Sequence, residues 1–356
     1  MAQLRVGIVG AAGYTGAELI RLIDAHPELR LEFVAARENA GQRLGQVLPF
    51  TEGAAGLGEL PLEAFDESQA AEVARRVDVA FTALPHAASA RLGGALLDQG
   101  VQVVDLSADF RLRELETYQQ WYGEHPRPEL LERAVYGLPE LYRKELEGAR
   151  LIAGPGCYPT STILPLAPLF RAGLLETDTP LIVDGKSGVS GAGRKPGPKF
   201  HFPETAEGLR PYNVGGGHRH TPEMEQELSV AAGGAPLRVL FTPQLVPMIR
   251  GILTTTYSRP KAGVTVEQCR QAARDLYGTG GLVTVLDDKV LPDTLNVRGS
   301  ARAQLAYALD PRTGLLLTMS AIDNLARGAS AQALQAFNVS RGFAETAGIP
   351  RLAMFP

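Results

Sequence analysis

The sequence contains very little cysteine, with only Cys157 and Cys269 among its 356 residues. Two cysteines cannot build a disulfide framework, which is typical of proteins made for a reducing compartment. They also cannot supply a cysteine-rich zinc site. We therefore expect a cytoplasmic protein without a structural metal.

Long apolar runs and a strong excess of one charge are also missing. No stretch approaches the ~20 residues of a membrane span, and Met1–Arg5 leads into a strand-like run without the pattern of a signal peptide. The net charge of -4 gives no general attraction to nucleic acid or anionic membranes. A chain that is 45% hydrophobic and 21% charged is typical of a soluble protein, here of about two domains.

A glycine-rich turn stands between a predicted strand and a predicted helix near the N-terminus. An apolar strand pattern leads into GAAGYTG, from Gly10 to Gly16, and a helical spacing of apolar residues follows. Gly10 would permit the tight turn, Gly13 would let a pyrophosphate approach the backbone, and Gly16 would let helix and strand pack closely. We expect a dinucleotide site here, with a plain tight turn as the alternative.

The second predicted strand, residues 31–36, ends at Arg37. Sites specific for NAD usually carry an acidic residue at this point, whereas an arginine suits the 2′-phosphate of NADP. We therefore expect NADP. The alternative, which the adjacent Glu38 keeps open, is that Arg37 is only a solvated loop charge.

Further strands are predicted at 77–84 and 101–107, with helices between them, including 87–99. This alternation predicts a doubly wound parallel sheet. Ligands of such sheets bind at the carboxyl ends of the strands. The residues at these ends are Gly10, Arg37, Pro85, His86 and Ser107.

Charged residues follow the fourth strand, and a histidine follows the third. Asp109 and Arg111 would either pair as a salt bridge or face the active cleft, where Arg111 would bind a phosphate or carboxylate. For His86 we favour capping of the helix that starts at Ala87 over a catalytic role.

Cys157 lies in GPGCYPTS (154–161), between a predicted strand at 151–153 and an apolar helix pattern at 160–169. Where a helix begins, free N–H groups and the helix dipole favour a thiolate. We interpret Cys157 as a nucleophile rather than an inert thiol. Cys269, within an amphipathic helix pattern, is interpreted as structural.

A nucleophilic cysteine needs a partner that moves protons. His26, His125 and His201 have the setting of surface loops. His218 and His220 follow three glycines and would point to one side of an extended segment.

Thr221 and Pro222 come next and would cap and open a helix. We expect His218 or His220 to be the acid or base. A metal site is disfavoured because no third ligand stands at a suitable spacing.

Two later segments also suggest ligand contacts. Residues 184–196 are rich in glycine and basic near their end, and they would cradle a phosphate or form a flexible surface loop; they lack the P-loop pattern. Residues 321–329 precede a helix pattern at 331–337. Within them Asn324 would contact a cofactor amide or serve as a turn residue.

Five motifs together resemble the N-acetyl-gamma-glutamyl-phosphate reductases of arginine biosynthesis, along essentially the whole chain. The motifs are GAAGYTG (10–16), LSADFR (106–111), GPGCYPT (154–160), GHRHTPE (217–223) and DNLARGA (323–329). That family is similar in fold and logic to aspartate-semialdehyde and glyceraldehyde-phosphate dehydrogenases. The resemblance implies an α/β protein with a discontinuous, Rossmann-type NADP-binding domain (1–153 and 328–356). It also implies an α+β catalytic and dimerisation domain with a large mixed sheet (154–327).

The resemblance further implies that the Cys157 thiolate attacks an acyl phosphate, that hydride from NADPH reduces the thioester, and that N-acetylglutamate semialdehyde is released. His218 or His220 would manage protons. Substrate anions would be held by Arg111, Arg194 and Lys195. The expected cofactor contacts are Gly10, Gly13, Tyr14, Thr15, Gly16, Arg37, Pro85, Ser107, Ser187, Gly188 and Asn324.

Other functions compete with this interpretation. A related reductase of lysine biosynthesis acts on carrier-protein-bound aminoadipyl phosphate, and there Asn-Ala-Thr tends to follow the cysteine; Tyr158-Pro159-Thr160 favours the arginine pathway. Another phosphorylating semialdehyde dehydrogenase is a further alternative. A non-catalytic NADP sensor would show a degraded cysteine or histidine motif, and both are intact. The resemblance implies a homodimer or homotetramer.

Overall fold

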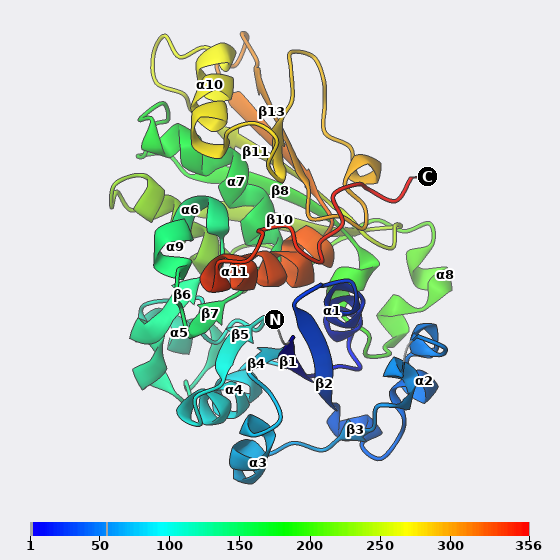
Figure 1. The fold of residues 1–356 in the computed structure, drawn as a ribbon. Helices are drawn as coiled ribbons and strands as arrows, with labels where there is room; N and C mark the ends of the chain where they lie inside the picture. The colour runs from blue at the N-terminus through cyan, green and yellow to red at the C-terminus, as the bar shows by residue number, and fades with distance from the viewer. Residues whose placement is uncertain (1–2, 55, 356) are drawn as a thin grey trace. The chain divides into compact units, whose positions relative to one another are not determined.

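The computed structural model describes residues 3–54 and 56–355, which form two compact units (Figure 1). Unit 1 comprises the described residues of Met1–Pro155 and Ala329–Ile349, and unit 2 those of Gly156–Gly328 and Pro350–Pro356. The end of the chain thus groups with unit 2, whereas the resemblance assigned it to the nucleotide-binding domain. One reason is a backbone hydrogen bond within unit 2, donated by the Met354 N–H to the Arg298 carbonyl at 2.8 Å.

Unit 1 contains a sheet in the order β3-β2-β1-β4-β5-β7-β6, in which every neighbouring pair is parallel. The predicted doubly wound parallel sheet is therefore confirmed. The strand order reverses direction beside β1, and this switch point is where such sheets bind ligands. The strands are β1 (Leu4–Val9), β2 (Leu29–Ala35), β3 (Leu62–Glu63), β4 (Val79–Thr82), β5 (Gln102–Asp105), β6 (Ala134–Tyr136) and β7 (Leu151–Ala153).

Helices surround this sheet, and α11 returns to it from the end of the chain. The first ten residues of α11 are all buried, and α11 packs on α1, α6, β5 and β7. Figure 1 shows it in red. The predicted helix at 331–337 is confirmed and continues to Arg341. The helices are α1 (Tyr14–Asp24), α2 (Leu44–Val47), α3 (Ala70–Ala74), α4 (Ala88–Asp98), α5 (Leu115–Tyr122), α6 (Pro139–Leu146) and α11 (Ala331–Arg341).

Unit 2 contains a mixed sheet in the order β12-β13-β14-β11-β8-β10-β9, as predicted. Its β8–β10 and β12–β13 pairs are parallel, and the other pairs are antiparallel. The strands are β8 (Leu181–Gly188), β9 (Arg210–Pro211), β10 (Val239–Val246), β11 (Ile252–Ser258), β12 (Val283–Val285), β13 (Ala303–Leu309) and β14 (Leu316–Ile322).

Three helices of unit 2 pack on this sheet. α7 contacts β11, β13 and β14, α9 contacts β10, and α10 contacts β13. Buried residues alternate with more exposed ones along β8, β10 and β11, so one face of the sheet is more open. The helices are α7 (Cys157–Arg171), α8 (Phe202–Thr205), α9 (Thr221–Ala231) and α10 (Val266–Tyr277).

α7 is almost entirely buried although it contains two prolines, Pro165 and Pro168. A proline inside a helix leaves the carbonyl four residues earlier without its usual N–H donor. For Pro168 that carbonyl is Leu164, and it accepts a hydrogen bond from the Tyr277 hydroxyl at 2.6 Å. The helix that begins at Cys157 is thereby kept intact in an apolar setting.

The segment 184–196 was expected to be one glycine-rich loop, and this was wrong for its first five residues. Asp184–Gly188 belong to β8, which pairs with β10 and β11 on either side. The tertiary pairing outweighs the local glycine content here. Only the remainder forms a short 3-10 turn, Val189–Ala192, and a largely exposed loop.

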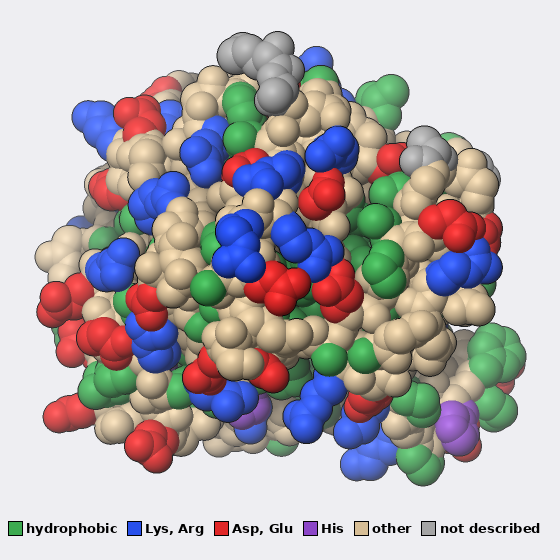
Figure 2. Space-filling view, turned by 60° about the horizontal axis from the view of Figure 1, so that its bottom comes forward, with side chains coloured by type: hydrophobic (Ala, Val, Ile, Leu, Met, Phe, Trp, Pro, Cys, Tyr) green, Lys and Arg blue, Asp and Glu red, His purple; other side chains and the backbone are tan. Residues whose placement is uncertain are grey.

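The molecular face in Figure 2 carries Lys and Arg side chains interspersed with Asp and Glu. Such mixing also appears as ion pairs across the described surface, for example Arg76 with Glu63 at 2.6 Å and Arg127 with Asp98 at 3.0 Å. This face therefore presents no single-sign patch of the kind that binds polyanions.

Candidate active site

Cys157 is the first residue of α7, with Gly156 as the N-cap. The helix thus begins three residues earlier than predicted, and the thiol is part of its first turn. The N–H groups of a first turn have no partners within the helix, and they favour negative charge at this end. Cys157 is half-buried, which is compatible with a reactive thiolate.

Two side chains of unit 2 lie against Gly156, immediately before the thiol. A Cβ placed on Gly156 would be 2.8 Å from His220 Nε2 and 3.0 Å from Glu223 Oε2, so any larger residue would require these side chains to move. The Gly156 N–H also donates to Glu223 Oε1 at 2.8 Å. The structure therefore brings His220 and Glu223 to the start of α7.

Glu223 is a site residue that the sequence analysis missed. We expected Thr221 to cap α9, but His220 is the N-cap and Thr221 the first helical residue. His220 and Glu223 are three residues apart, and this spacing puts them on one side of the first turn. The GHRHTPE motif contained this signal, because an acidic residue stands three positions after a candidate acid or base.

His218 has a different environment from His220. Its Nδ1 accepts a hydrogen bond from the His220 N–H at 3.1 Å, and its ring meets Tyr158, Tyr212 and Phe241 edge to face. Burial lowers the pKa of His218 to about 4, with a smaller contribution from the Arg219 charge. His218 is therefore neutral near pH 7. The two rings do come together, at 4.8 Å, but through a turn and not an extended segment.

Cys269 is fully buried in α10, and burial raises the pKa of its thiol to about 11. A thiol with this pKa is almost entirely protonated near neutral pH. The structural interpretation of Cys269 agrees with this environment.

The glycine turn in unit 1 has the shape of a cofactor cradle. Gly10 has a φ of +99°, and a Cβ on it would lie 2.3 Å from the Ala83 carbonyl oxygen. A Cβ on Gly16 would be 2.5 Å from the Gly10 oxygen, whereas one on Gly13 would meet nothing nearer than 3.6 Å. Gly10 and Gly16 are thus needed for packing, while Gly13 leaves the side next to the start of α1 open. The site fits a pyrophosphate, with Tyr14 and Thr15 in the first helical turn.

Arg37 begins a short 3-10 turn directly after β2 and is exposed. Among the described residues, no salt bridge is formed by Arg37. Its guanidinium is therefore available to a ligand, as recognition of a 2′-phosphate requires.

Asp109 organises the end of the sheet near Ser107. Its carboxylate accepts hydrogen bonds from the Ala87 N–H at 2.8 Å and the Ala90 N–H at 2.7 Å, and it also accepts one from the Tyr118 hydroxyl at 2.8 Å. Asp109 therefore caps the start of α4, a role that the sequence had suggested for His86. Ser107 joins this network, because its hydroxyl donates to Asp105 at 2.6 Å and accepts from the Asp109 N–H at 3.1 Å.

Two histidines expected on the surface are buried, so those predictions were wrong. His125 Nε2 is 2.8 Å from the Asp109 carbonyl oxygen, and His26 Nε2 is 3.0 Å from Asn338 Oδ1. In each case a protein oxygen takes the place of the water that the ring would bind on the surface. Because that partner is distant in the sequence, the polarity of the neighbouring residues does not reveal the burial. His201 is exposed, as expected.

Arg111 is buried and binds two backbone carbonyls. Its Nε donates to Gly154 at 2.7 Å and one terminal nitrogen donates to Leu106 at 2.8 Å. The side chain therefore fastens the loop after β5 to the turn that precedes Cys157 in the chain. These two bonds involve Nε and one terminal nitrogen, and contact of Arg111 with a substrate anion stays a prediction.

The remaining predicted contacts lie in several settings. Ser187 and Gly188 end β8, Arg194 and Lys195 are on the exposed loop beyond it, and Pro85 follows β4. Asn324 is buried, and its amide is engaged within unit 2.

The Asn324 amide makes two hydrogen bonds: Oδ1 accepts from the Gly251 N–H at 2.7 Å and Nδ2 donates to the Ser190 hydroxyl at 2.9 Å. These bonds explain the position of Asn324 without a cofactor.

Comparison with known proteins identifies the family. Residues 5–149 match the model described as semialdehyde dehydrogenase, NAD binding domain, and residues 157–324 match semialdehyde dehydrogenase, dimerisation domain. The chain belongs to the semialdehyde dehydrogenase family. Within it, the chain is 48% identical to the N-acetyl-gamma-glutamyl-phosphate reductase of Syntrophobacter fumaroxidans, covering 98% of each chain. It is 47% identical to the one of Magnetococcus marinus, covering 99% of each.

Solved structures of much lower identity share the fold. Aspartate semialdehyde dehydrogenase II from Vibrio cholerae superimposes with a TM-score of 0.70 at 17% identity, covering 96% of this chain and 100% of that one. The comparison supports the combination of a parallel-sheet unit with a mixed-sheet unit.

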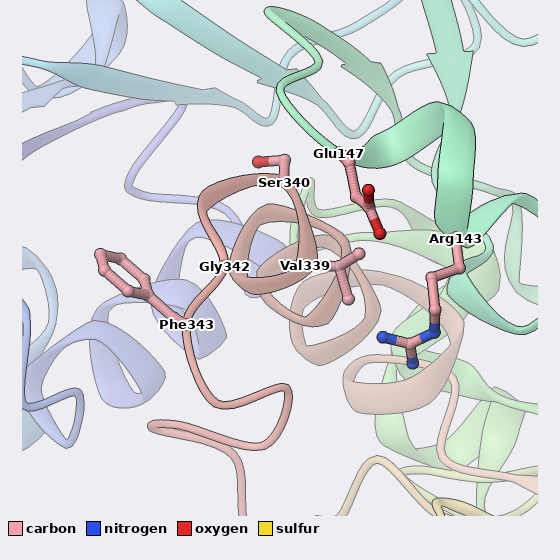
Figure 3. Close-up of a pocket in the computed structure, with 6 residues that line it drawn as sticks. All are labelled: Arg143, Glu147, Val339, Ser340, Gly342 and Phe343. Carbon is pink, nitrogen blue, oxygen red and sulfur yellow. The ribbon is translucent and has the colours of Figure 1, made fainter.

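A surface pocket of about 350 Å³ in unit 1 is lined by no predicted site residue (Figure 3). Among residues 3–54 and 56–355, no group of three His, Cys, Asp or Glu is arranged to hold a metal ion. No helix in this part of the chain is long and apolar enough to cross a membrane. The pocket residues are Arg143, Glu147, Val339, Ser340, Gly342 and Phe343.

Proposed function

We propose that this chain is an N-acetyl-gamma-glutamyl-phosphate reductase. It converts N-acetyl-γ-glutamyl phosphate to N-acetylglutamate 5-semialdehyde and phosphate, with NADPH as reductant, in arginine biosynthesis. The observation that carries the proposal is the placement of Cys157 in the first turn of α7, with His220 against the preceding residue. Relatives with this name are 47–48% identical over 98–99% of the chain.

In the first step, the Cys157 thiolate attacks the carbonyl carbon of the acyl phosphate. A C–S bond forms, the C–O bond to phosphate breaks, and phosphate leaves with the electron pair of that bond. The product is a thioester on Cys157. The N–H groups at the start of α7 favour the thiolate before attack.

The glycine turn and Arg37 are the residues that would hold the cofactor. NADPH bound there supplies the hydride that reduces the thioester carbonyl. Gly13 leaves the backbone open to the pyrophosphate, and the start of α1 presents N–H groups to it. Arg37 selects the 2′-phosphate.

His220 is assigned as the acid and base. It protonates the oxygen of the developing thiohemiacetal and then removes that proton when the C–S bond breaks and the aldehyde leaves. His218 orients the His220 backbone through the hydrogen bond at Nδ1. Glu223 holds the Gly156 N–H and lies beside the His220 ring.

Substrate anions are assigned to Arg194 and Lys195, which are exposed on the loop after β8. Arg111 is assigned a positioning role, because two of its nitrogens bind backbone carbonyls. We further propose that copies assemble through unit 2 as a homodimer or homotetramer, and that the enzyme works in the cytoplasm.

The test is the reverse reaction with N-acetylglutamate semialdehyde, phosphate and NADP⁺. We expect phosphate-dependent NADPH formation by the wild type and by Cys269→Ser, and a loss of at least ~10³-fold in Cys157→Ser. No turnover by the wild type would overturn the substrate assignment, and undiminished activity in Cys157→Ser would overturn the nucleophile. Turnover restricted to the carrier-bound aminoadipate semialdehyde would instead favour the lysine-pathway reductase.

A further inference from the structure

The segment Asp323–Gly328 reaches the residue that begins α7. A Cβ on Gly328 would lie 2.6 Å from Cys157 Cβ and 3.1 Å from Cys157 Cα. Carbon atoms do not approach that closely, so the backbone of Gly328 packs directly on Cys157. The φ of Gly328 is outside the left-handed region, so alanine there would be opposed by Cys157 and not by its own backbone.

Asp323 holds both ends of this segment. Its buried carboxylate accepts hydrogen bonds from the N–H groups of Leu325 at 2.9 Å and Ala326 at 2.8 Å. It also accepts one from the Gly299 N–H at 2.6 Å. The Asp323 carbonyl accepts the Gly328 N–H at 2.8 Å. Asp323 therefore binds this segment both near its start and at Gly328.

Arg250 completes the arrangement with a two-pronged ion pair. Its Nε and one terminal nitrogen donate to the two carboxylate oxygens of Asp323 at 2.9 and 3.0 Å. A buried carboxylate requires such a partner, because an uncompensated charge is costly away from water. Planar pairing of this kind also fixes the orientation of the carboxylate.

We propose that Asp323, held by Arg250, is a positioning residue for the Cys157 thiol and acts through the backbone of Gly328. This inference rests on the proposed role of Cys157 as the nucleophile. The contacts lead from the Arg250–Asp323 ion pair through the segment Asp323–Gly328 to Cys157. Its function is to keep Cys157 in the first turn of α7, where the free N–H groups favour the thiolate.

The first test compares Gly328→Ala with Gly281→Ala, where a Cβ would meet only the Tyr277 oxygen, at 3.8 Å. The pH profile of iodoacetamide alkylation is measured at Cys157 in the chain without substrate or cofactor, and kcat and KM are measured in the reverse reaction. We expect Gly328→Ala to raise the alkylation midpoint and to lower kcat by about 10- to 100-fold with KM within about twofold, the pattern of a displaced reacting group. Gly281→Ala should have the same alkylation midpoint, kcat and KM as the wild type.

The second test uses Arg250, in case Gly328→Ala does not fold. Arg250→Met should raise the alkylation midpoint and lower kcat. Arg250→Lys keeps the cation, so its alkylation midpoint and kcat should lie between those of Arg250→Met and the wild type. Midpoints and kcat equal to the wild type in Gly328→Ala, or in both Arg250 variants, would overturn the proposal. Failure of the proposed function appears separately, as full activity in Cys157→Ser.

Discussion

The His220 backbone N–H donates to Nδ1 of His218 at 3.1 Å. Because of this bond, His218 and His220, which are separated by one residue in the sequence, have different structural roles. His218 accepts at Nδ1, and burial keeps it neutral, whereas His220 places its Nε2 against the residue that precedes Cys157. The pair therefore consists of one ring that lies against Gly156, the residue before Cys157, and a second ring that accepts a hydrogen bond from the backbone of the first.

The first prediction separates these roles by substitution. His220→Asn removes the acid and base and should lower kcat by about 10²- to 10⁴-fold. His218→Asn keeps a side-chain acceptor near the His220 N–H and should cost about tenfold or less. Steady-state rates of the reverse reaction measure both. A larger loss in His218→Asn than in His220→Asn would reverse the assignment.

The second prediction concerns the pH dependence of stability. The pKa of His218 is about 4 in the folded chain, below its ordinary value of 6.5. Between these values the unfolded chain binds the proton more readily, so this residue makes the free energy of unfolding fall as pH decreases from 6.5 to about 4. Urea unfolding from pH 7.5 to 4.5 should show a smaller decrease in His218→Asn than in the wild type. Parallel curves for the two proteins would contradict the burial of a neutral ring.

The third prediction concerns the two thiols. Cys157 is half-buried at a helix start, and Cys269 is fully buried with its pKa raised to about 11. We expect iodoacetamide at neutral pH to modify one thiol per native chain and two after denaturation, with mass spectrometry locating the first at Cys157. Native labelling of Cys269 in a Cys157→Ser background at a similar rate would contradict the assignment.

The fourth prediction concerns the choice of cofactor. Arg37→Ala should raise KM for NADPH by about 10- to 100-fold, the effect of losing a charge-assisted hydrogen bond to phosphate, and should leave KM for NADH little changed. Glu38→Gln is the matched control on the adjacent residue and should change neither value by more than about twofold. An unchanged KM for NADPH in Arg37→Ala would show that the guanidinium is only a solvated charge.

Much of the fold and part of the site follow from local sequence. Apolar periodicity predicted the strands and the helix at 331–337, and their alternation predicted the parallel sheet, because strand patterns and helix spacing are properties of neighbouring residues. The spacing of its glycines predicted the turn at 10–16. The same reasoning failed for His26 and His125. Their polar, proline-rich neighbourhoods suggest exposure, but both rings are buried with partners distant in the chain.

Motif spacing by itself determined the family resemblance and predicted that Cys157 and the two histidines serve one chemistry, because nucleophile, base and cofactor turn are each encoded in a few adjacent residues. Only the tertiary structure decided that His220 lies against Gly156, that Glu223 holds the Gly156 N–H, and that Gly328 packs on Cys157. These are contacts between segments more than 60 residues apart in the sequence. Their geometry depends on how α7, α9 and the Asp323–Gly328 segment pack, and no local pattern specifies that packing.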